Sequence, residues 1–435
     1  MFNSDTLQRF QQVETPFYYY DLKLLQQTLS ACKLAADKYD FKVHYAMKAN
    51  FNEEVISYVQ KAGFGADCVS GNEVKKAIEI GFAAQKVVFA GVGKSDKEIN
   101  EALDLDIFCF NAESVQELEV INDLAGKKNK TARIALRINP NVDALTHQYI
   151  TTGLEENKFG INQWELPACV EAIKKAENLQ MIGIHFHIGS QITNLDVFKS
   201  LCVKVNEIHH WFAERGFQLQ VLNVGGGLGV DYHHPDENPM VDFDQYFEIF
   251  DRFLDRKPGQ EIHFELGRAL VANCGSLISR VLYVKNGLKK NFVILDAGMT
   301  ELMRPALYQA YHKIELINDQ ESEIGEQELA ISNQKSAISD RQSAIRHQQS
   351  VISNQSPAVN SQSSGSESQT ANLKSQIKYD VVGPICESTD CFGKEIELPL
   401  IKRGDLMAIR TAGAYGEVMA SGYNLRERVK SVYSD

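Results

Sequence analysis

Short apolar runs alternate with longer amphipathic segments between about residues 40 and 270. Most of these runs lack polar residues at alternate positions, which is typical of strands buried on both faces. The runs predicted to be strands are Val43–Met47, Gly65–Val69, Lys86–Ala90, Ile107–Phe110, Arg133–Ile138, Gly183–His187, Val221–Val224 and Ile262–Phe264. Helical periodicity separates several of them, as in Asn72–Ile80, Ser95–Leu103, Ser114–Leu124 and Leu166–Ala176.

Eight such units over this length match a (β/α)8 TIM barrel, which we expect at residues 25–270. The main alternative, a doubly wound open sheet, usually has fewer strands. A barrel carries its functional groups just after the strands, at its C-terminal face. The residues at those positions are Lys48, Asp67, Gly91, Asn111, Asn139, His187, Gly225–Gly227 and Glu265. Polar residues and glycines therefore gather where the barrel prediction requires them.

The pattern of apolar and polar residues changes after residue 275. Strand-like runs now follow one another with few helical patterns between them, namely Ser276–Val284, Phe292–Leu295, Tyr379–Val382 and Leu406–Arg410. This pattern predicts a second, mostly β domain of the Greek-key or β-sandwich kind. We assign to it residues 271–435 together with an N-terminal segment, residues 1–24.

Residues 319–376 fit neither pattern. They contain no Phe, Trp or Tyr and are rich in Ser, Gln and Asn. A seven-residue repeat runs through Ala330–Ser336, Ala337–Ser343 and Ala344–Ser350 and then degrades. Its apolar residues are adjacent and do not have coiled-coil spacing, so we predict a disordered insertion within the β domain. A weak helix in the repeat is the alternative.

Composition narrows the class of protein. A chain of 435 residues that is 44% hydrophobic can form two domains, and its net charge of −12 argues against a partner that is nucleic acid or an anionic membrane. No apolar run approaches the roughly 20 residues of a membrane span. The eight cysteines form no CxxC pair and lie scattered through apolar runs, as free thiols do in a reducing compartment. We therefore expect a cytoplasmic protein.

Lys48 ends the first predicted strand, directly before Ala49-Asn50. At the end of a barrel strand its amine would enter a pocket, where burial is expected to lower its pKa. A neutral lysine amine is a nucleophile suited to Schiff-base chemistry. In isolation, a lysine after a strand is more often a solvated residue.

Two further strand ends carry candidate ligands for an anion. Gly225-Gly226-Gly227 would let backbone N–H groups approach a phosphate, although three glycines alone more often mark a tight turn. The spacing is not GxGxxG, which argues against NAD. Glu265 could hold a protonated ring nitrogen, and the adjoining Gly267-Arg268 pair could bind a phosphate or carboxylate. A surface ion pair is the alternative.

The sixth predicted strand ends in His185-Phe186-His187 and is followed by Ser190. Alternation places the two histidines on one face of the strand. His187 could stack on an aromatic cofactor and Ser190 could bind phosphate, whereas a satisfied core histidine is the common alternative. No metal site is expected, because no third ligand has suitable spacing.

Seven motifs together resemble one family. In chain order they are YAMKAN (45–50), HFHIGSQ (185–191), NVGGGLG (223–229), ELGR (265–268), LDAGMTELMRPALY (295–308), GPICESTD (383–390) and GAYGEVMASGYN (413–424). They are similar to the fold-type III decarboxylases that depend on pyridoxal 5′-phosphate (PLP). The resemblance covers the chain except for the insertion and implies an alanine-racemase-like barrel with a C-terminal β domain.

The resemblance also implies roles for individual residues. Lys48 would form the Schiff base with PLP, and Cys386 would return a proton to the substrate carbon. The residues implied to bind PLP are Lys48, Asp67, His187, Ser190, Gly227, Glu265, Gly267, Arg268 and Tyr415. Those implied to bind the substrate are Arg268, Arg304, Tyr308, Glu387 and Tyr415. In a homodimer, Cys386 and Glu387 would come from the partner subunit, so that the active site is shared across the interface.

Within the family the chain is most similar to the members that act on diaminopimelate. This implies decarboxylation of meso-2,6-diaminopimelate to L-lysine and CO2, the last step of lysine biosynthesis. Arg268 and Arg304 suit a distal carboxylate and Glu387 suits an ammonium group. Decarboxylation of carboxynorspermidine, ornithine or arginine is the alternative. A non-enzymatic regulator of this fold is expected to have lost Lys48, Cys386 or Glu387, and all three are present.

Overall fold

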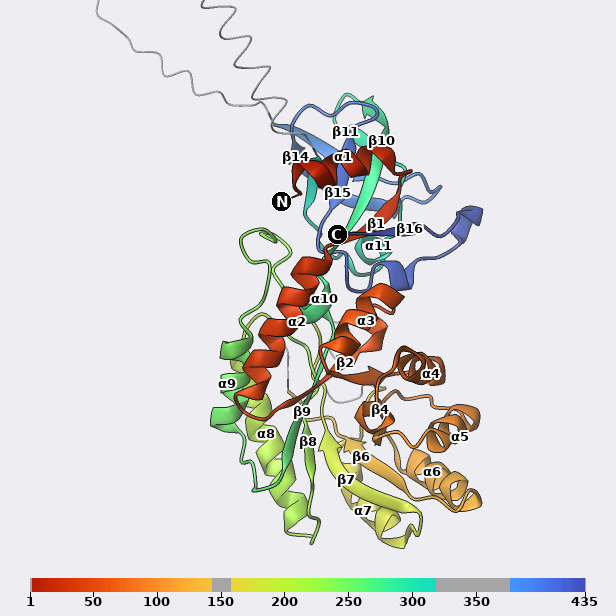
Figure 1. Cartoon of the computed structure of the whole chain (residues 1–435), viewed down its shortest axis with the longest axis vertical. Helices are drawn as coiled ribbons and strands as arrows, with labels where there is room; N and C mark the ends of the chain where they lie inside the picture. Colours follow the sequence, from red (N-terminus) through yellow and green to blue (C-terminus); the bar gives the residue numbers. More distant parts are fainter. Residues whose placement is uncertain (1, 143–157, 318–375, 435) are drawn as a thin grey trace, which may run out of the picture.

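The computed structural model describes residues 2–142, 158–317 and 376–434. In Figure 1 a barrel ringed by helices occupies the lower part of the molecule and a β domain the upper part. The predicted insertion at 319–376 lies outside the described residues except for its last position. No helix among the described residues is long and apolar enough to cross a membrane.

Eight parallel strands close into the barrel, so the predicted TIM-barrel fold is confirmed. Each strand pairs with the next, and β9 pairs back with β2 through Val43 and Phe264. The strands are β2 (Lys42–Ala46), β3 (Gly65–Cys68), β4 (Val87–Phe89), β5 (Cys109–Ala112), β6 (Ala132–Arg137), β7 (Leu179–His185), β8 (Val221–Asn223) and β9 (Glu261–Leu266). Each overlaps one predicted run.

Helices cover the outside of the barrel (Figure 1). They are α2 (Leu22–Asp37), α3 (Glu53–Lys61), α4 (Gly71–Ile80), α5 (Asp96–Asp104), α6 (Val115–Lys127), α7 (Leu166–Lys175), α8 (Asp196–Ala213) and α9 (Phe243–Phe253). Short 3-10 turns occur at η1 (Met47–Ala49), η2 (Ala84–Lys86) and η3 (Gln163–Glu165). The start of α5 shows why these helices begin where they do: Ser95 and Glu98 form a reciprocal capping box.

A mixed sheet of eight strands forms the second domain, as the expectation of a mostly β domain requires. Its main path runs β12-β15-β10-β11-β13-β14, with β1 beside β10 and β16 beside β1. The strands are β1 (Phe17–Tyr20), β10 (Gly275–Asn286), β11 (Asn291–Leu295), β12 (Ile314–Ile317), β13 (Ile377–Val382), β14 (Cys391–Leu398), β15 (Leu406–Ile409) and β16 (Lys430–Tyr433). Its helical segments are α1 (Ser4–Gln12), α11 (Arg304–Tyr308), η4 (Glu417–Met419) and η5 (Tyr423–Leu425).

The first strand of the chain belongs to this second sheet. β1 pairs antiparallel with β10 and parallel with β16, so both chain ends meet there. The chain passes from barrel to sheet through the short helix α10 (Arg268–Val271), which directly follows β9. The domain limits given above, with residue 24 as the end of the N-terminal segment, stay a prediction, since α2 begins at Leu22 and continues onto the barrel.

A tight aromatic cluster packs β9 against the helical layer. Phe264 is fully buried and contacts the rings of Phe41, Phe247 and Phe250 at centroid separations of 5.2, 4.8 and 4.9 Å. This packing fixes β9, whose C-terminal end carries Glu265 into the barrel mouth.

We expect Phe264→Ala to lower the free energy of unfolding by about 3–5 kcal/mol, because a buried ring is lost and a cavity remains. Chemical denaturation with circular dichroism measures this change. Phe253→Ala is the matched control: Phe253 is 40% exposed, so its loss should cost about 0.5 kcal/mol or less. Equal effects of the two variants would contradict the packing argument.

Candidate active site

The interior of the barrel changes from apolar to polar toward the C-terminal ends of its strands. Cys109 and Val221 belong to a buried apolar cluster. Two residues further along the same strands stand Asn111 and Asn223, both buried. Residues two apart in a strand share a face, so the amides form a polar layer above the apolar one. This layer is the floor of the candidate site.

Glu265 is the centre of the polar layer. Its Oε1 accepts hydrogen bonds from the side-chain amides of Asn111 at 3.1 Å and Asn223 at 2.8 Å. Its Oε2 lies 2.9 Å from Nε2 of His185. Burial acts to raise the pKa of Glu265, but His185, His187 and Lys48 outweigh burial and hold the pKa well below its usual range. Glu265 is thus a buried, fixed anion.

Lys48 lies in η1, directly after β2, and lines the same cavity. The expected lowering of its pKa is wrong. Burial does lower the pKa, but the interactions with Asp67, Tyr415 and Glu265 more than offset burial, and the pKa lies above its ordinary value. The free amine is therefore held as an ammonium ion. Sequence reasoning considered burial and left out the carboxylates that the barrel brings to the lysine.

Asp67, near the end of β3, makes the largest of the contributions that raise the pKa of Lys48. Burial and the neighbouring charge of Glu265 raise the pKa of Asp67 well above its usual value. Its Oδ1 atom is buried and has no hydrogen-bond partner within the described part of the chain. An unsatisfied buried acceptor of this kind marks a place where a bound group is expected to supply the missing partner.

The glycine loop after β8 packs directly on its neighbours. A Cβ atom on Gly225 would lie 2.0 Å from the carbonyl oxygen of Phe186, and one on Gly226 would lie 2.0 Å from that of Glu265. Glycine is required at both positions, because no side chain fits. The N–H of Gly226 donates to Nδ1 of His187 at 3.4 Å. The loop thereby ties β7 to β9 and places Gly227 in the cavity wall.

His187 lies just beyond β7, which ends at His185. The two histidines were expected to share one face of the strand, but His187 is in the following loop and His185 alone is in the strand. Burial, followed by the charges of Lys48 and Arg137, holds the pKa of His187 well below its ordinary value. His187 is therefore a neutral imidazole lining the cavity, as a stacking ring would be.

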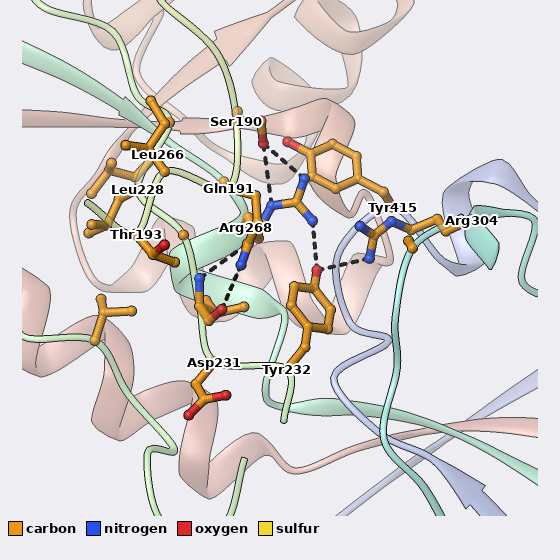
Figure 2. Close-up of a pocket in the computed structure, with 18 of the residues that line it drawn as sticks. Ser190, Gln191, Thr193, Leu228, Asp231, Tyr232, Leu266, Arg268, Arg304 and Tyr415 are labelled. Carbon is orange, nitrogen blue, oxygen red and sulfur yellow. Dashed lines mark hydrogen bonds between the residues drawn. The ribbon is translucent and has the colours of Figure 1, made fainter. Parts of the chain in front are cut away.

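Two arginines and a tyrosine form one hydrogen-bonded cluster at a wall of the cavity (Figure 2). The guanidinium of Arg268 donates to Oγ of Ser190 through Nε at 3.3 Å and through Nη2 at 2.8 Å. Arg268 Nη1 donates to the hydroxyl oxygen of Tyr232 at 2.6 Å, and Arg304 Nη1 donates to the same oxygen at 2.8 Å. The hydroxyl of Tyr232 thus links Arg268 in α10 to Arg304 in α11, two helices that are far apart in the sequence.

Three more of the predicted residues line this cavity. The guanidinium group of Arg268 lies 4.9 Å from the centroid of the Tyr415 ring. The backbone N–H of Tyr415 donates to the carbonyl of Ala49 at 2.7 Å. Tyr308 is at the end of α11 and faces the cavity. A Cβ on Gly267 would lie 3.0 Å from that of Ala49 and 3.5 Å from the hydroxyl of Tyr415. Glycine at 267 therefore keeps the space beside the lysine turn open.

Cys386 and Glu387 are the predicted residues that the structure does not bring to the cavity. Both are exposed in the turn between β13 and β14, and neither lines the cavity. The Glu387 carboxylate accepts a hydrogen bond from the hydroxyl of Tyr423 at 2.7 Å. Asp390 anchors the turn, because its carboxylate accepts from the N–H groups of Met299 at 2.6 Å and Ile385 at 2.7 Å.

Sequence reasoning missed several residues of the site. Tyr232 comes five positions after Gly227 in an irregular segment, with no pattern that marks it. Asn111 was noted as a strand end, but its bond to Glu265 joins strands that are far apart in the sequence. The signal available for Asn223 was its place two residues before the glycine run and two residues after Val221, an apolar strand position.

The cavity fits PLP. Its volume is about 1020 Å³, enough for a phosphate-bearing ring and an amino acid, and its walls carry Lys48, His187 and Glu265. The unpartnered oxygen of Asp67 and the space kept open by Gly267 are features that a bound cofactor would use. The neutral imidazole of His187 and the fixed carboxylate of Glu265 suit an aromatic ring that carries a positive charge.

Comparisons with known proteins agree with this fit. Residues 23–272 match the family described as pyridoxal-dependent decarboxylase, pyridoxal binding domain. Residues 325–413 match the family described as pyridoxal-dependent decarboxylase, C-terminal sheet domain.

Several similar proteins are named diaminopimelate decarboxylase. Diaminopimelate decarboxylase of Bacteroides thetaiotaomicron is 49% identical over 430 residues, covering 99% of this chain and 98% of the relative. That of Aquifex aeolicus is 35% identical and covers 96% and 86%. The crystal structure of the Helicobacter pylori diaminopimelate decarboxylase complexed with L-lysine is 36% identical, with a TM-score of 0.81 and coverage of 98% and 93%. The chain therefore belongs to the pyridoxal-dependent decarboxylases and, within them, to the diaminopimelate decarboxylase family.

Proposed function

We propose that this protein decarboxylates meso-2,6-diaminopimelate to L-lysine and CO2, with PLP as its cofactor, as the last step of lysine biosynthesis. The observation that carries the substrate assignment is the pair of guanidinium groups, Arg268 and Arg304, in the cavity that also holds Lys48. Two buried cations favour a substrate whose distal end bears a carboxylate. Ornithine and arginine would bring a further cation there, so their decarboxylation is the weaker alternative.

The cofactor would be held by residues from several strand ends. Lys48 would bind it covalently through its amine, His187 would stack on its ring, and Asp67 would contribute its free acceptor. Glu265 would accept a hydrogen bond from the protonated ring nitrogen. The groups proposed for the phosphate are Ser190, Gly227, Tyr415 and the backbone of Gly267 and Arg268. When bound, PLP supplies an electron sink for the electron pair that CO2 leaves behind.

The other residues bind substrate or move a proton. Arg268, Arg304, Tyr308 and Tyr415 would hold the distal amino-acid end. The thiol of Cys386 would donate a proton to the carbon that has lost CO2. The buried anion at Glu265 favours a charged ring nitrogen throughout, because its pKa stays low.

Cys386 and Glu387 would act in the active site of the partner subunit of a homodimer. Their exposure and their absence from the walls of the cavity support this proposal, because a catalytic thiol must reach the substrate. The anchoring of their turn through Asp390 would present both side chains in one fixed direction. A cytoplasmic location stays a prediction, and it agrees with the free state of the cysteines.

The purified protein with PLP should convert meso-diaminopimelate to L-lysine, and Lys48→Ala should abolish this activity and the visible absorbance of the lysine-bound cofactor. The measurement is lysine release by chromatography alongside an absorbance spectrum. Lys42→Ala, which changes a lysine at the opposite end of β2, should retain both. Activity on ornithine or arginine, with none on diaminopimelate, would overturn the substrate assignment.

Mixing two inactive variants should test the shared site. Lys48→Ala and Cys386→Ala dimers should each be inactive, but after subunit exchange roughly a quarter of the wild-type activity should return, since half of the dimers are hybrids with one intact site. Lys48→Ala mixed with Glu265→Ala is the control, because both changes affect groups of one subunit's barrel. Restoration in the control, or none in the first mixture, would contradict a shared site.

The raised pKa of Lys48 predicts how the apoprotein takes up PLP. The reactive neutral amine is scarce below the pKa, so the uptake rate should rise with pH, by roughly tenfold per unit. Asp67→Asn removes the main cause of the raised pKa, so uptake at a given pH should be faster. Stopped-flow absorbance measures the rate.

Glu261→Gln, at the opposite end of β9, is the control for uptake and should leave the pH profile unchanged. Slower uptake in Asp67→Asn across the whole pH range would show that Asp67 serves PLP binding more than it restrains the lysine.

A further inference from the structure

The hydroxyl oxygen of Tyr232 lies between two guanidinium groups. Nη1 of Arg268 and Nη1 of Arg304 donate to it at 2.6 and 2.8 Å (Figure 2). All three residues are buried, with 6–7% of their surface exposed. A guanidinium group only donates hydrogen bonds. The oxygen therefore accepts twice, and it joins the two arginines.

Each arginine is also held on its far side. Arg268 is bound to Oγ of Ser190. Nη1 of Arg304 lies 3.2 Å from Nε2 of His312, whose Nδ1 lies 2.9 Å from the carbonyl oxygen of Arg410. A carbonyl can only accept, so Nδ1 of His312 carries the hydrogen and Nε2 accepts from Arg304. Burial, then the charge of Arg304, lowers the pKa of His312 to about 3, which keeps the imidazole neutral.

The arginine pair lacks an ordinary counter-ion. Within the described residues, no carboxylate forms an ion pair with Arg268 or Arg304. The carboxylate of Asp231, which precedes Tyr232 in the chain, accepts instead from the N–H groups of His233 and His234 at 2.8 and 3.0 Å. Two like charges in a buried site repel each other strongly, and the phenol oxygen is the group placed to offset this repulsion.

We propose that Tyr232 is a positioning residue that holds Arg268 and Arg304 together as one receptor for a substrate carboxylate. The inference rests on the proposed function and extends it, since it names the group that makes two separate arginines a carboxylate site. The guanidinium N–H groups that Tyr232, Ser190 and His312 do not occupy would face the carboxylate.

The protonation of Tyr232 sets the charge of this receptor. The neutral phenol leaves both positive charges available, whereas a phenolate cancels one of them. Burial acts to raise the pKa of Tyr232, but Arg268 and Arg304 outweigh it and bring the pKa below its ordinary value. The groups facing the hydroxyl are these two arginines, with His312 edge-on to the ring at 5.2 Å and neutral. Carboxylate affinity should therefore fall as pH rises through the pKa of Tyr232.

The test is Tyr232→Phe in the PLP-loaded enzyme. Losing an acceptor for two charged donors should raise KM for meso-diaminopimelate about ten- to a hundredfold, with a much smaller change in kcat. Calorimetry should show a matching loss of affinity for L-lysine, which keeps a carboxylate. Affinity for 1,5-diaminopentane, which has no carboxylate, should stay within about twofold. The fall in affinity at alkaline pH should disappear in the variant.

Tyr246→Phe is the matched control. Tyr246 is fully buried in α9 and its hydroxyl has no hydrogen-bond partner among the described residues, so this change should leave KM and both affinities as in the wild type. Unchanged lysine affinity in Tyr232→Phe would overturn the proposal. An equal loss for lysine and 1,5-diaminopentane would also overturn it, because that result indicates general disruption of the pocket.

Ultraviolet difference titration of the wild type needs neither a variant nor turnover. One tyrosine should ionise earlier than the others, and adding L-lysine should shift that ionisation to higher pH, because a bound carboxylate disfavours the phenolate. No early tyrosine, or an early one that lysine leaves unmoved, would overturn the proposal. The two proposals can fail separately. If the protein does not turn over diaminopimelate, but one tyrosine ionises early and acetate shifts this ionisation to higher pH, the substrate assignment is wrong and the carboxylate receptor is supported.

Discussion

The site depends on a tie between the lysine turn and the β domain. The side-chain amide of Asn50 donates to the hydroxyl of Tyr20 in β1 at 2.9 Å and to the carbonyl of Gly413 at 2.8 Å. The N–H of Tyr415 donates to the carbonyl of Ala49. Asn50 is buried, so losing these bonds would leave polar groups without partners, at about 1–3 kcal/mol each. The barrel provides the strand that ends in Lys48, and the β domain fixes where the turn after it lies.

The pKa values of the ionisable groups in the barrel mouth depend on this placement of Lys48. Burial is the largest single influence on the pKa of Lys48, Asp67 and Glu265. Neighbouring groups together reverse the effect of burial for Lys48 and Glu265, but they do not reverse it for Asp67. Glu265 stays ionised because amides and a histidine surround it, while Asp67 lacks comparable partners and its pKa rises. The pKa values of two carboxylates in one cavity thus shift in opposite directions, and Glu265 has hydrogen-bond partners that Asp67 lacks.

The two ends of the cavity are built by different principles. The floor comes from the regular strand ends of the barrel, where residues two apart share a face. The arginine wall comes from α10, α11 and an irregular segment that holds Tyr232, so its geometry depends on how the β domain docks on the barrel (Figures 1 and 2). A site of this kind responds to changes at the domain junction as well as to changes in its own residues.

The sequence by itself determined the barrel, the mostly β second domain and the positions of Lys48, Glu265 and the glycine loop. These features leave local signals, because buried strands are continuous apolar runs and their ends carry polar residues or glycine. Motif resemblance supplied the family and the predicted roles. Only the tertiary structure decided the raised pKa of Lys48, the place of Tyr232 between two arginines and the exclusion of Cys386 and Glu387 from this subunit's cavity. Each of these rests on contacts between residues far apart in the chain, and electrostatic energies depend on distances that no local pattern encodes.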